Sequence, residues 1–202
     1  MNSIKYNKEL VYPSKVVCVG RNYVEHIKEL NNETPSQMVL FNKPNSAITN
    51  ELKFFSDTHR FEGELCYLIK DKKIAGIGFG LDLTDREAQD YAKTKGLPWE
   101  RAKAFNGSAV MSHFTDFNGN LEDLSFKLFI NGKLQQEANF DLMIYKPFTI
   151  VEEIESFLSL EDNDIIMSGT PKGVGSYKIG DRFSAIIYEK GKEILNCEWR
   201  VV

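Results

Sequence analysis

The strongest constraint on the fold lies between residues 61 and 83, where two apolar segments flank a short polar turn. The first segment is FEGELCYLI (61–69), the turn contains DKK (71–73), and the second segment is IAGIGFGLDL (74–83). Short apolar runs bounded by turn residues are typical of buried strands. A turn this short joins antiparallel neighbours, so the sequence predicts a β-hairpin here.

Three carboxylates interrupt this apolar hairpin. Glu62 and Glu64 lie two residues apart and point to the same face of the first strand. The hairpin brings Asp82, at the end of the second strand, back beside them. Desolvated carboxylates repel one another unless something positive compensates them, and an all-oxygen set without histidine or cysteine favours Mg²⁺ or Mn²⁺. The alternative is a trio of solvated acids at strand ends, and spacing alone does not separate the two interpretations.

Composition places the chain among ordered globular proteins. It has 202 residues, of which 42% are hydrophobic and 12% aromatic, and this predicts a single domain over residues 1–202. The net charge is −4 and no basic run is present, so nucleic acid is a poor candidate partner.

The sequence contains no indication of a membrane span or of export. No apolar stretch of about 18 residues occurs, and the first residues lack the apolar run of a signal peptide. The cysteines Cys18, Cys66 and Cys197 are scattered and flanked by apolar residues. This pattern predicts reduced thiols and a cytoplasmic location.

The remaining pattern predicts a strand-rich α+β fold with a few short helices. Strands are expected at 15–20 and 38–44, before an Asn-Gly turn at 131–132, and through the last third of the chain. Helices are expected at the three ranges 22–32, 84–96 and 149–160. The second would begin with a capping box from Thr84 to Glu87, and the third with one from Thr149 to Glu152.

A histidine and a glutamate lie three residues apart in EHIKE (25–29). His26 and Glu29 would fall on the same side of the predicted helix, within reach of each other. A carboxylate that holds one imidazole nitrogen leaves the other free to accept a proton from water. The alternative is an ordinary surface helix, which such a spacing fits equally well.

Six segments in order resemble the fumarylacetoacetate hydrolase family. They are VVCVGRNYVEHIKE, VLFNKP, FEGELCYLI, GFGLDLTDREAQ, KGLPWERAKAF, and DIIMSGTPKGVG followed by GDRF. The resemblance runs from residue 15 to the C terminus and is closest to the short acylpyruvase type. It implies a mixed β-sandwich roll or barrel-like fold, as in the C-terminal domain of that family, and a homodimer.

The resemblance also implies roles for individual residues. The metal ligands for Mg²⁺ (or Mn²⁺) would be Glu62, Glu64 and Asp82. His26 and Glu29 would be a catalytic pair, and Lys103 would donate to a developing oxyanion; without the resemblance, Lys103 is one more solvated lysine. The residues that would bind substrate are Arg21, Lys43, Gln89, Gly169 and Thr170. Their alternatives are a structural arginine, a loop lysine, a helix-surface amide and a plain turn.

The reaction that the resemblance implies is cleavage of a C–C bond in an acylpyruvate, a 2,4-dioxo acid. The metal would stabilise a pyruvate enolate, while His26, held by Glu29, would activate water. The same enolate serves decarboxylation or tautomerisation of oxaloacetate, and isomerisation of 2-hydroxyhepta-2,4-diene-1,7-dioate. The His26–Glu29 pair favours hydrolysis among these, and a non-catalytic metal-binding protein remains a further alternative.

Two departures from the family pattern concern the substrate pocket. The stretch NGKLQQEANF keeps Gln136 but has Ala138 and Phe140 where the family commonly has glycine and threonine. The turn begins with Ser168 in place of the usual threonine, which is a mild change. The sequence therefore leaves the identity of the 2-oxo acid open.

Overall fold

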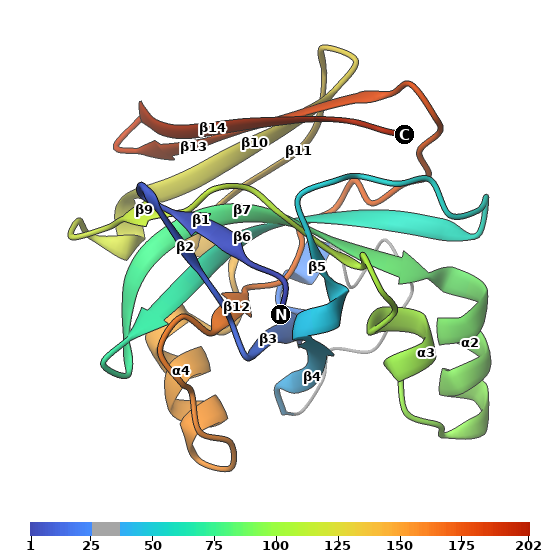
Figure 1. Cartoon of the computed structure of the whole chain (residues 1–202), viewed down its shortest axis with the longest axis horizontal. Helices are drawn as coiled ribbons and strands as arrows, with labels where there is room; N and C mark the ends of the chain where they lie inside the picture. Colours follow the sequence, from blue (N-terminus) through green and yellow to red (C-terminus); the bar gives the residue numbers. More distant parts are fainter. Residues whose placement is uncertain (26–36) are drawn as a thin grey trace.

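The computed structural model describes residues 1–25 and 37–202. Within that part, a large curled mixed sheet is covered on one face by a smaller antiparallel sheet (Figure 1). The helices lie on the other side of the large sheet, away from the small one (Figure 1). The predicted α+β fold of mixed sheets, rolled into a partial barrel, is confirmed. A single domain over 1–202 stays a prediction.

The large sheet brings together strands that are far apart in the sequence. Its described strands run in the order β4 (Val39–Pro44), β3 (Lys15–Gly20), β12 (Ile165–Met167), β6 (His59–Lys70), β7 (Lys73–Asp85), β8 (Ala109–Met111) and β5 (Ile48–Thr49), with β9 (Thr115–Asp116) also paired to β7. The β12–β3 and β5–β8 pairs are parallel, and the others are antiparallel. Strand β12 therefore places the turn that follows it beside β6.

The predicted hairpin is the longest feature of the large sheet. Strands β6 and β7 pair antiparallel from His59↔Asp85 to Lys70↔Lys73, and Asp71 and Lys72 form the turn with φ values of 48° and 58°. Positive φ at both central residues is characteristic of a type I′ turn, whose twist matches that of the strands. This register places Glu62 directly opposite Asp82.

The small sheet consists of β11 (Lys133–Asn139), β10 (Leu124–Ile130), β13 (Arg182–Glu189) and β14 (Lys192–Arg200), in that order. The predicted Asn131-Gly132 turn joins β10 to β11, with φ values of 50° and 78°. Aromatic side chains from both sheets pack together: Phe79 lies 5.0 Å from Phe126 between ring centroids, nearly edge-on. This layer between the sheets is the main hydrophobic core.

The described helices are α2 (Arg86–Lys95), α3 (Glu100–Lys103) and α4 (Pro147–Glu155), with short 3₁₀ turns at Asn45–Ala47, Leu121–Asp123 and Phe140–Leu142. Both predicted capping boxes are wrong. Asp85, not Thr84, caps α2 by accepting a hydrogen bond from the Ala88 N–H at 3.3 Å. Helix α4 begins two residues before Thr149, at Pro147, a residue whose fixed φ suits the first helical position. Gly96 ends α2 with a φ of 64°, as expected.

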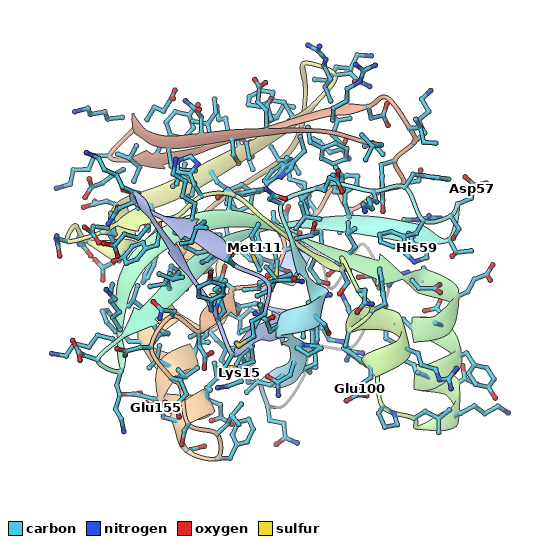
Figure 2. All side chains as sticks on the ribbon, viewed as in Figure 1. Lys15, Asp57, His59, Glu100, Met111 and Glu155 are labelled. Carbon is cyan, nitrogen blue, oxygen red and sulfur yellow. The ribbon has the colours of Figure 1, made fainter. Side chains whose placement is uncertain are left out.

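An N-terminal hairpin, β1 (Ile4–Tyr6) and β2 (Glu9–Val11), crosses in front of the large sheet (Figure 1). Ile4 and Tyr6 belong to a second core cluster there, which also contains Met111. In Figure 2, Met111 lies near the middle of the molecule, whereas the exposed Glu100 and Glu155 lie at its margins. Most of the helix predicted over 22–32 lies outside the described residues.

One buried carboxylate joins the start of β3 to the start of β12. Asp164 is fully buried and accepts hydrogen bonds from the Ser14 N–H at 3.0 Å, the Ser14 hydroxyl at 2.7 Å and the Glu161 N–H at 2.9 Å. The Lys15 ammonium forms an ion pair with it. Burial alone would raise the pKa of Asp164, but the hydrogen bonds from Lys15, Ser14 and Glu161 outweigh burial and lower that pKa below its ordinary value.

We expect Asp164 to make folding stability depend on pH in the acid range. Because its pKa is lower in the folded chain than in the unfolded chain, its stabilisation is complete above pH of about 4 and is lost as the pH falls through the folded pKa. Asp164→Asn should lose about 3 kcal/mol at neutral pH and show a shallower acid slope. Denaturant unfolding from neutral to acid pH measures both. Glu51→Gln, in an exposed ion pair with Lys53, is the control and should change little; an unaltered acid slope in Asp164→Asn would refute the assignment.

Candidate metal centre and active site

Three carboxylates converge at the open end of the β6–β7 hairpin. Glu62, Glu64 and Asp82 each offer one oxygen atom, and these atoms lie within 4.8 Å of one another. All three side chains are buried, Asp82 completely. Glu62 and Glu64 share a face of β6 because they are two residues apart, and the strand register brings Asp82 opposite Glu62. The juxtaposition expected from the sequence is therefore present.

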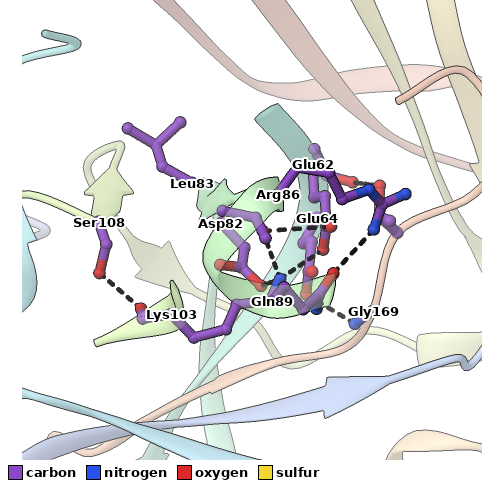
Figure 3. Close-up of polar contacts among 12 residues, drawn as sticks. Glu62, Glu64, Asp82, Leu83, Arg86, Gln89, Lys103, Ser108 and Gly169 are labelled. Carbon is purple, nitrogen blue, oxygen red and sulfur yellow. Dashed lines mark hydrogen bonds and ion pairs between the residues drawn. The ribbon is translucent and has the colours of Figure 1, made fainter. Parts of the chain in front are cut away.

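A buried ammonium group lies against this cluster. Lys103, at the end of α3, places Nζ 2.9 Å from Glu62 Oε2 and 2.7 Å from Asp82 Oδ2 (Figure 3). The Thr84 hydroxyl accepts from Lys103 and donates to Glu62 Oε1 at 3.2 Å. Burial alone would lower the pKa of Lys103, but the negative charges of Asp82 and Glu62 outweigh burial and raise that pKa above its ordinary value. Lys103 is thus held as a cation and a hydrogen-bond donor.

Glu64 faces a different partner. Its Oε2 accepts a hydrogen bond from the Gly169 N–H at 2.7 Å, in the turn that follows β12. Burial, together with the charges of Asp82 and Glu62, raises the pKa of Glu64 well above its usual range. Gly169 has a φ of 96°, and a Cβ there would lie 2.7 Å from Asn22 Cβ, so this close approach requires glycine.

Lys43 lies on the other side of Asp82. Its side chain is fully buried, and Nζ is 2.8 Å from Asp82 Oδ1 and 3.0 Å from Ser108 Oγ. It also donates to the backbone carbonyl of Lys103, to which the Ser108 hydroxyl donates at 2.7 Å. Lys43 therefore connects Asp82 to the end of α3. Its predicted substrate-binding role stays a prediction, and a solvated loop lysine is excluded.

One face of α2 presents polar groups beside the carboxylates. Arg86, Gln89 and Lys93 are spaced three and four residues apart, and Arg86 donates to Gln89 Oε1 at 2.7 Å. Gln89 is buried, so the surface-amide alternative does not hold, and Figure 3 shows Arg86 and Gln89 close to Glu62. Burial lowers the pKa of Lys93, and the positive charges of Arg86 and Arg21 lower it further. The charges of Arg86 and Arg21 therefore reach the Lys93 ammonium, as does that of Glu62.

The carboxylate cluster fits a divalent cation. Its donors are all oxygens, which suits Mg²⁺ or Mn²⁺. Asp82 Oδ1 has the Lys43 ammonium at 2.8 Å but receives no aligned hydrogen bond from the described residues. Lys43 and Lys103 lie against Asp82 and Glu62, whereas Glu64 has a pKa raised by burial and by the charges of Asp82 and Glu62, so a cation bound there would relieve that repulsion.

The structure gathers most of the residues that the sequence singled out. Those that lie in or beside the cluster are Lys43, Glu62, Glu64, Asp82, Gln89, Lys103, Gly169 and Thr170. The charge of Arg21 acts on Lys93 of α2, and its predicted substrate-binding role stays a prediction. His26 and Glu29 lie outside the described residues, so their pairing and their roles stay predictions.

Three residues of this region were missed by sequence reasoning. Thr84 was interpreted as a helix cap, Ser108 had no signal of its own, and Arg86 was hidden in the supposed capping box. A usable signal existed for Arg86, because it precedes Gln89 by one helical turn. None existed for Ser108, whose contact with Lys43 joins segments 65 residues apart.

Comparison with known proteins identifies the family. The family described as fumarylacetoacetate (FAA) hydrolase C-terminal matches residues 15–202. Oxaloacetate tautomerase YcgM of Escherichia coli (strain K12) is 37% identical over 196 residues, covering 87% of this chain and 89% of the relative. The crystal structure of a candidate fumarylacetoacetate isomerase/hydrolase from Oleispira antarctica is 36% identical, with a TM-score of 0.93 and complete coverage of both chains.

A further solved structure carries a metal. Fumarylpyruvate hydrolase from Pseudomonas aeruginosa, in complex with Mn²⁺ and pyruvate, has a TM-score of 0.88 and 27% identity, covering 100% of this chain and 95% of that one. The chain belongs to the fumarylacetoacetate hydrolase family, and the resemblance stated from its motifs is confirmed. No described helix is long and apolar enough to cross a membrane.

Proposed function

We propose that this protein is a divalent-cation-dependent tautomerase that interconverts the keto and enol forms of oxaloacetate. The proposal rests on the buried cluster of Glu62, Glu64 and Asp82, with the Lys103 ammonium against it. The relative YcgM, which this chain matches over most of its length, is an oxaloacetate tautomerase. The sequence placed acylpyruvate hydrolysis first and oxaloacetate tautomerisation among the alternatives. Relatives such as YcgM favour tautomerisation.

The three carboxylates would hold the cation, with Mg²⁺ or Mn²⁺ as the candidates. When bound, the cation would supply Lewis-acid polarisation of the 2-oxo group. The Mn²⁺ and pyruvate in the Pseudomonas aeruginosa hydrolase support a 2-oxo acid as the ligand class. Lys103, kept protonated by Asp82 and Glu62, would supply a fixed positive charge near the oxygen on C2 as negative charge develops there.

Tautomerisation moves one proton from C3 to the oxygen on C2, or back, and consumes no water. In this proposal His26 takes the C3 proton, with Glu29 orienting its imidazole, as the spacing of the two residues suggests. The same imidazole could activate water in a hydrolase, so this pair does not decide between the reactions.

The charge of the substrate separates a dicarboxylate such as oxaloacetate from an acylpyruvate with an uncharged tail. The positive charges of Arg86 and Arg21 and the negative charge of Glu62 all act on the Lys93 ammonium. Positive charge of this kind beside the site would favour a ligand with two carboxylates, such as oxaloacetate, over an acylpyruvate with an uncharged tail. Gln89 and the Gly169–Thr170 turn would then line the same pocket.

Hydrolysis of a fumarylpyruvate-type acid is the second candidate. It is favoured by the fold shared with the Pseudomonas aeruginosa hydrolase, and fumarylpyruvate also carries two carboxylates. A homodimer and a cytoplasmic location remain further predictions.

The test is a direct assay with enol-oxaloacetate. Purified protein with Mn²⁺ or Mg²⁺ should accelerate ketonisation, followed by loss of the ultraviolet absorbance of the enol, and EDTA should remove the acceleration. Fumarylpyruvate and acetylpyruvate are assayed in parallel for release of pyruvate. Release of pyruvate without any acceleration of oxaloacetate ketonisation would overturn the tautomerase proposal in favour of hydrolysis.

A further inference from the structure

One side chain of the small sheet reaches across to the large sheet directly behind the carboxylates. Gln136, on β11, is 2% exposed. Its Oε1 accepts a hydrogen bond from the Gly63 N–H at 3.0 Å. Its Nε2 donates to Thr170 Oγ1 at 2.9 Å and to the Pro171 carbonyl at 3.0 Å. The amide of Gln136 thus contacts two segments that support the site: strand β6 at Gly63, and the turn at Thr170 and Pro171.

Gly63 is the residue between Glu62 and Glu64. Alternate residues of a strand point to opposite faces, so Gly63 faces the small sheet while the two glutamates face the site. A Cβ on Gly63 would lie 2.7 Å from Gln136 Oε1 and 2.8 Å from Leu128 Cδ2. Glycine is therefore required if Gln136 is to approach the β6 backbone.

The contact fills a gap in the pairing of β6. Strand β12 pairs with β6 only as far as Cys66, so Gly63 lies beyond the end of that ladder. There the Thr170 hydroxyl donates to the Gly63 carbonyl at 3.0 Å, and Gln136 accepts from the Gly63 N–H. The side chains of Gln136 and Thr170 therefore form the hydrogen bonds with the N–H and C=O of Gly63 that a neighbouring strand would otherwise form.

The three residues close a ring of hydrogen bonds. Gln136 binds Gly63 and Thr170, and Thr170 binds Gly63. Next to Thr170, the Gly169 N–H holds Glu64. A displacement of the turn or of the β6 segment would therefore change the separation of the cation ligands.

We propose that Gln136 is a positioning residue of the cation centre, which fixes the Glu62–Gly63–Glu64 segment and the Gly169–Thr170 turn relative to each other. The inference rests on the proposed cation site but not on the identity of the substrate. The hydrogen bonds of Gln136 go to the Gly63 N–H, the Thr170 hydroxyl and the Pro171 carbonyl. Its effect on the site passes through the backbone of Gly63 and through Thr170.

The chain supplies a matched control one residue away. Gln135 is exposed, and its amide donates to the Gly173 carbonyl at 2.7 Å in the same loop. Gln136→Met keeps the length of the side chain and removes its hydrogen bonds, and Gln135→Met does the same at the surface. Gln136→Asn is a second variant, which leaves an amide to solvate the buried groups but is too short to reach both sheets.

Two readouts are measured without substrate. The first is hydrogen exchange of the Gly63 and Gly169 amides by NMR on the cation-free protein labelled with ¹⁵N-glycine. The second is the dissociation constant of Mn²⁺ by calorimetry. Gln136→Met and Gln136→Asn should accelerate exchange at both glycines and raise the Kd for Mn²⁺ about tenfold or more. Gln135→Met should leave both values as in the wild type.

A Kd for Mn²⁺ within twofold of the wild type in either folded Gln136 variant would overturn the proposal, even if exchange at Gly63 accelerated. The melting temperature distinguishes general destabilisation from a specific loss of Mn²⁺ affinity. Gln136→Asn should bind Mn²⁺ more weakly while remaining fully folded at the assay temperature. If the wild-type protein bound Mn²⁺ but turned over no 2-oxo acid, the proposed function would be wrong. The Kd for Mn²⁺ of the Gln136 variants relative to that of the wild type would still decide the role of Gln136.

Discussion

Replacing Glu64 by glutamine is expected to remove cation-dependent turnover while making the cation-free protein more stable. Glu64 is buried beside Asp82 and Glu62, and their charges add to burial in raising its pKa. An acid whose pKa is raised by folding loses stabilisation as the pH rises above its unfolded pKa, so at neutral pH the neutral glutamine relieves a cost. The same change removes one of the three proposed ligands.

The two effects are measured separately. Calorimetry should show the Kd for Mn²⁺ rising by at least about a hundredfold in Glu64→Gln, more than the loss of a supporting residue causes. Denaturant unfolding in EDTA at pH 7 should show a higher free energy of unfolding than in the wild type. Glu51→Gln, at the surface, should change neither quantity. Full activity of Glu64→Gln with Mg²⁺ or Mn²⁺ would refute the ligand assignment.

Replacing Lys43 by methionine is expected to cause the largest loss of stability, about 3–5 kcal/mol, because it removes one of the two buried ammonium groups, those of Lys43 and Lys103, that offset Asp82. Lys43 has no exposed surface, and its ammonium lies 2.8 Å from Asp82 Oδ1 and 3.0 Å from Ser108 Oγ. Added Mn²⁺ should recover part of this loss, since a cation bound to Asp82 would replace some of the missing positive charge.

The control is Lys53→Met, whose exposed ion pair with Glu51 is worth about 0.5 kcal/mol at most. Urea unfolding of the wild type and of both variants, with and without Mn²⁺, gives the six free energies needed. If Lys43 acted only on substrate, as the family resemblance implies, Lys43→Met would raise KM and keep the stability of the wild type. That result would contradict the structural role.

The local part of the site could be predicted from the sequence. The two-residue spacing of Glu62 and Glu64 and the short turn at 71–72 were enough to place Asp82 beside them, because strand period and hairpin register are local properties. The ligand atoms, all of them oxygens, predicted Mg²⁺ or Mn²⁺ as the cation. The order of the motifs then identified the family, which single motifs could not have done.

The contacts between distant segments could not be predicted. Thr84 was expected to cap a helix because its sequence neighbours form a capping box, yet its hydroxyl binds Glu62 and Lys103, and the strand continues through it. Gln136 was noted as part of a motif, but its contact with Gly63 spans 73 residues. Local propensity contains no information about such partners.

The sequence predicted the residues of the site better than it ranked the candidate reactions. Hydrolysis was placed first because a histidine and a glutamate can activate water, but such a pair can also carry a proton between carbon and oxygen. That the charges of Arg86 and Arg21 act on Lys93 depends on the folded chain, so the sequence alone could not use them to favour a doubly charged substrate.

The position of β12 has a consequence for how the protein is made. Residues 165–167 lie between β3 and β6, two strands that leave the ribosome much earlier. Until β12 arrives, each of those strands has an open edge, and Glu64 lacks the N–H of Gly169. The pocket is therefore completed only after residues 165–169 emerge, and until then a nascent chain that already contains β6 carries Glu64 without the backbone N–H that holds it.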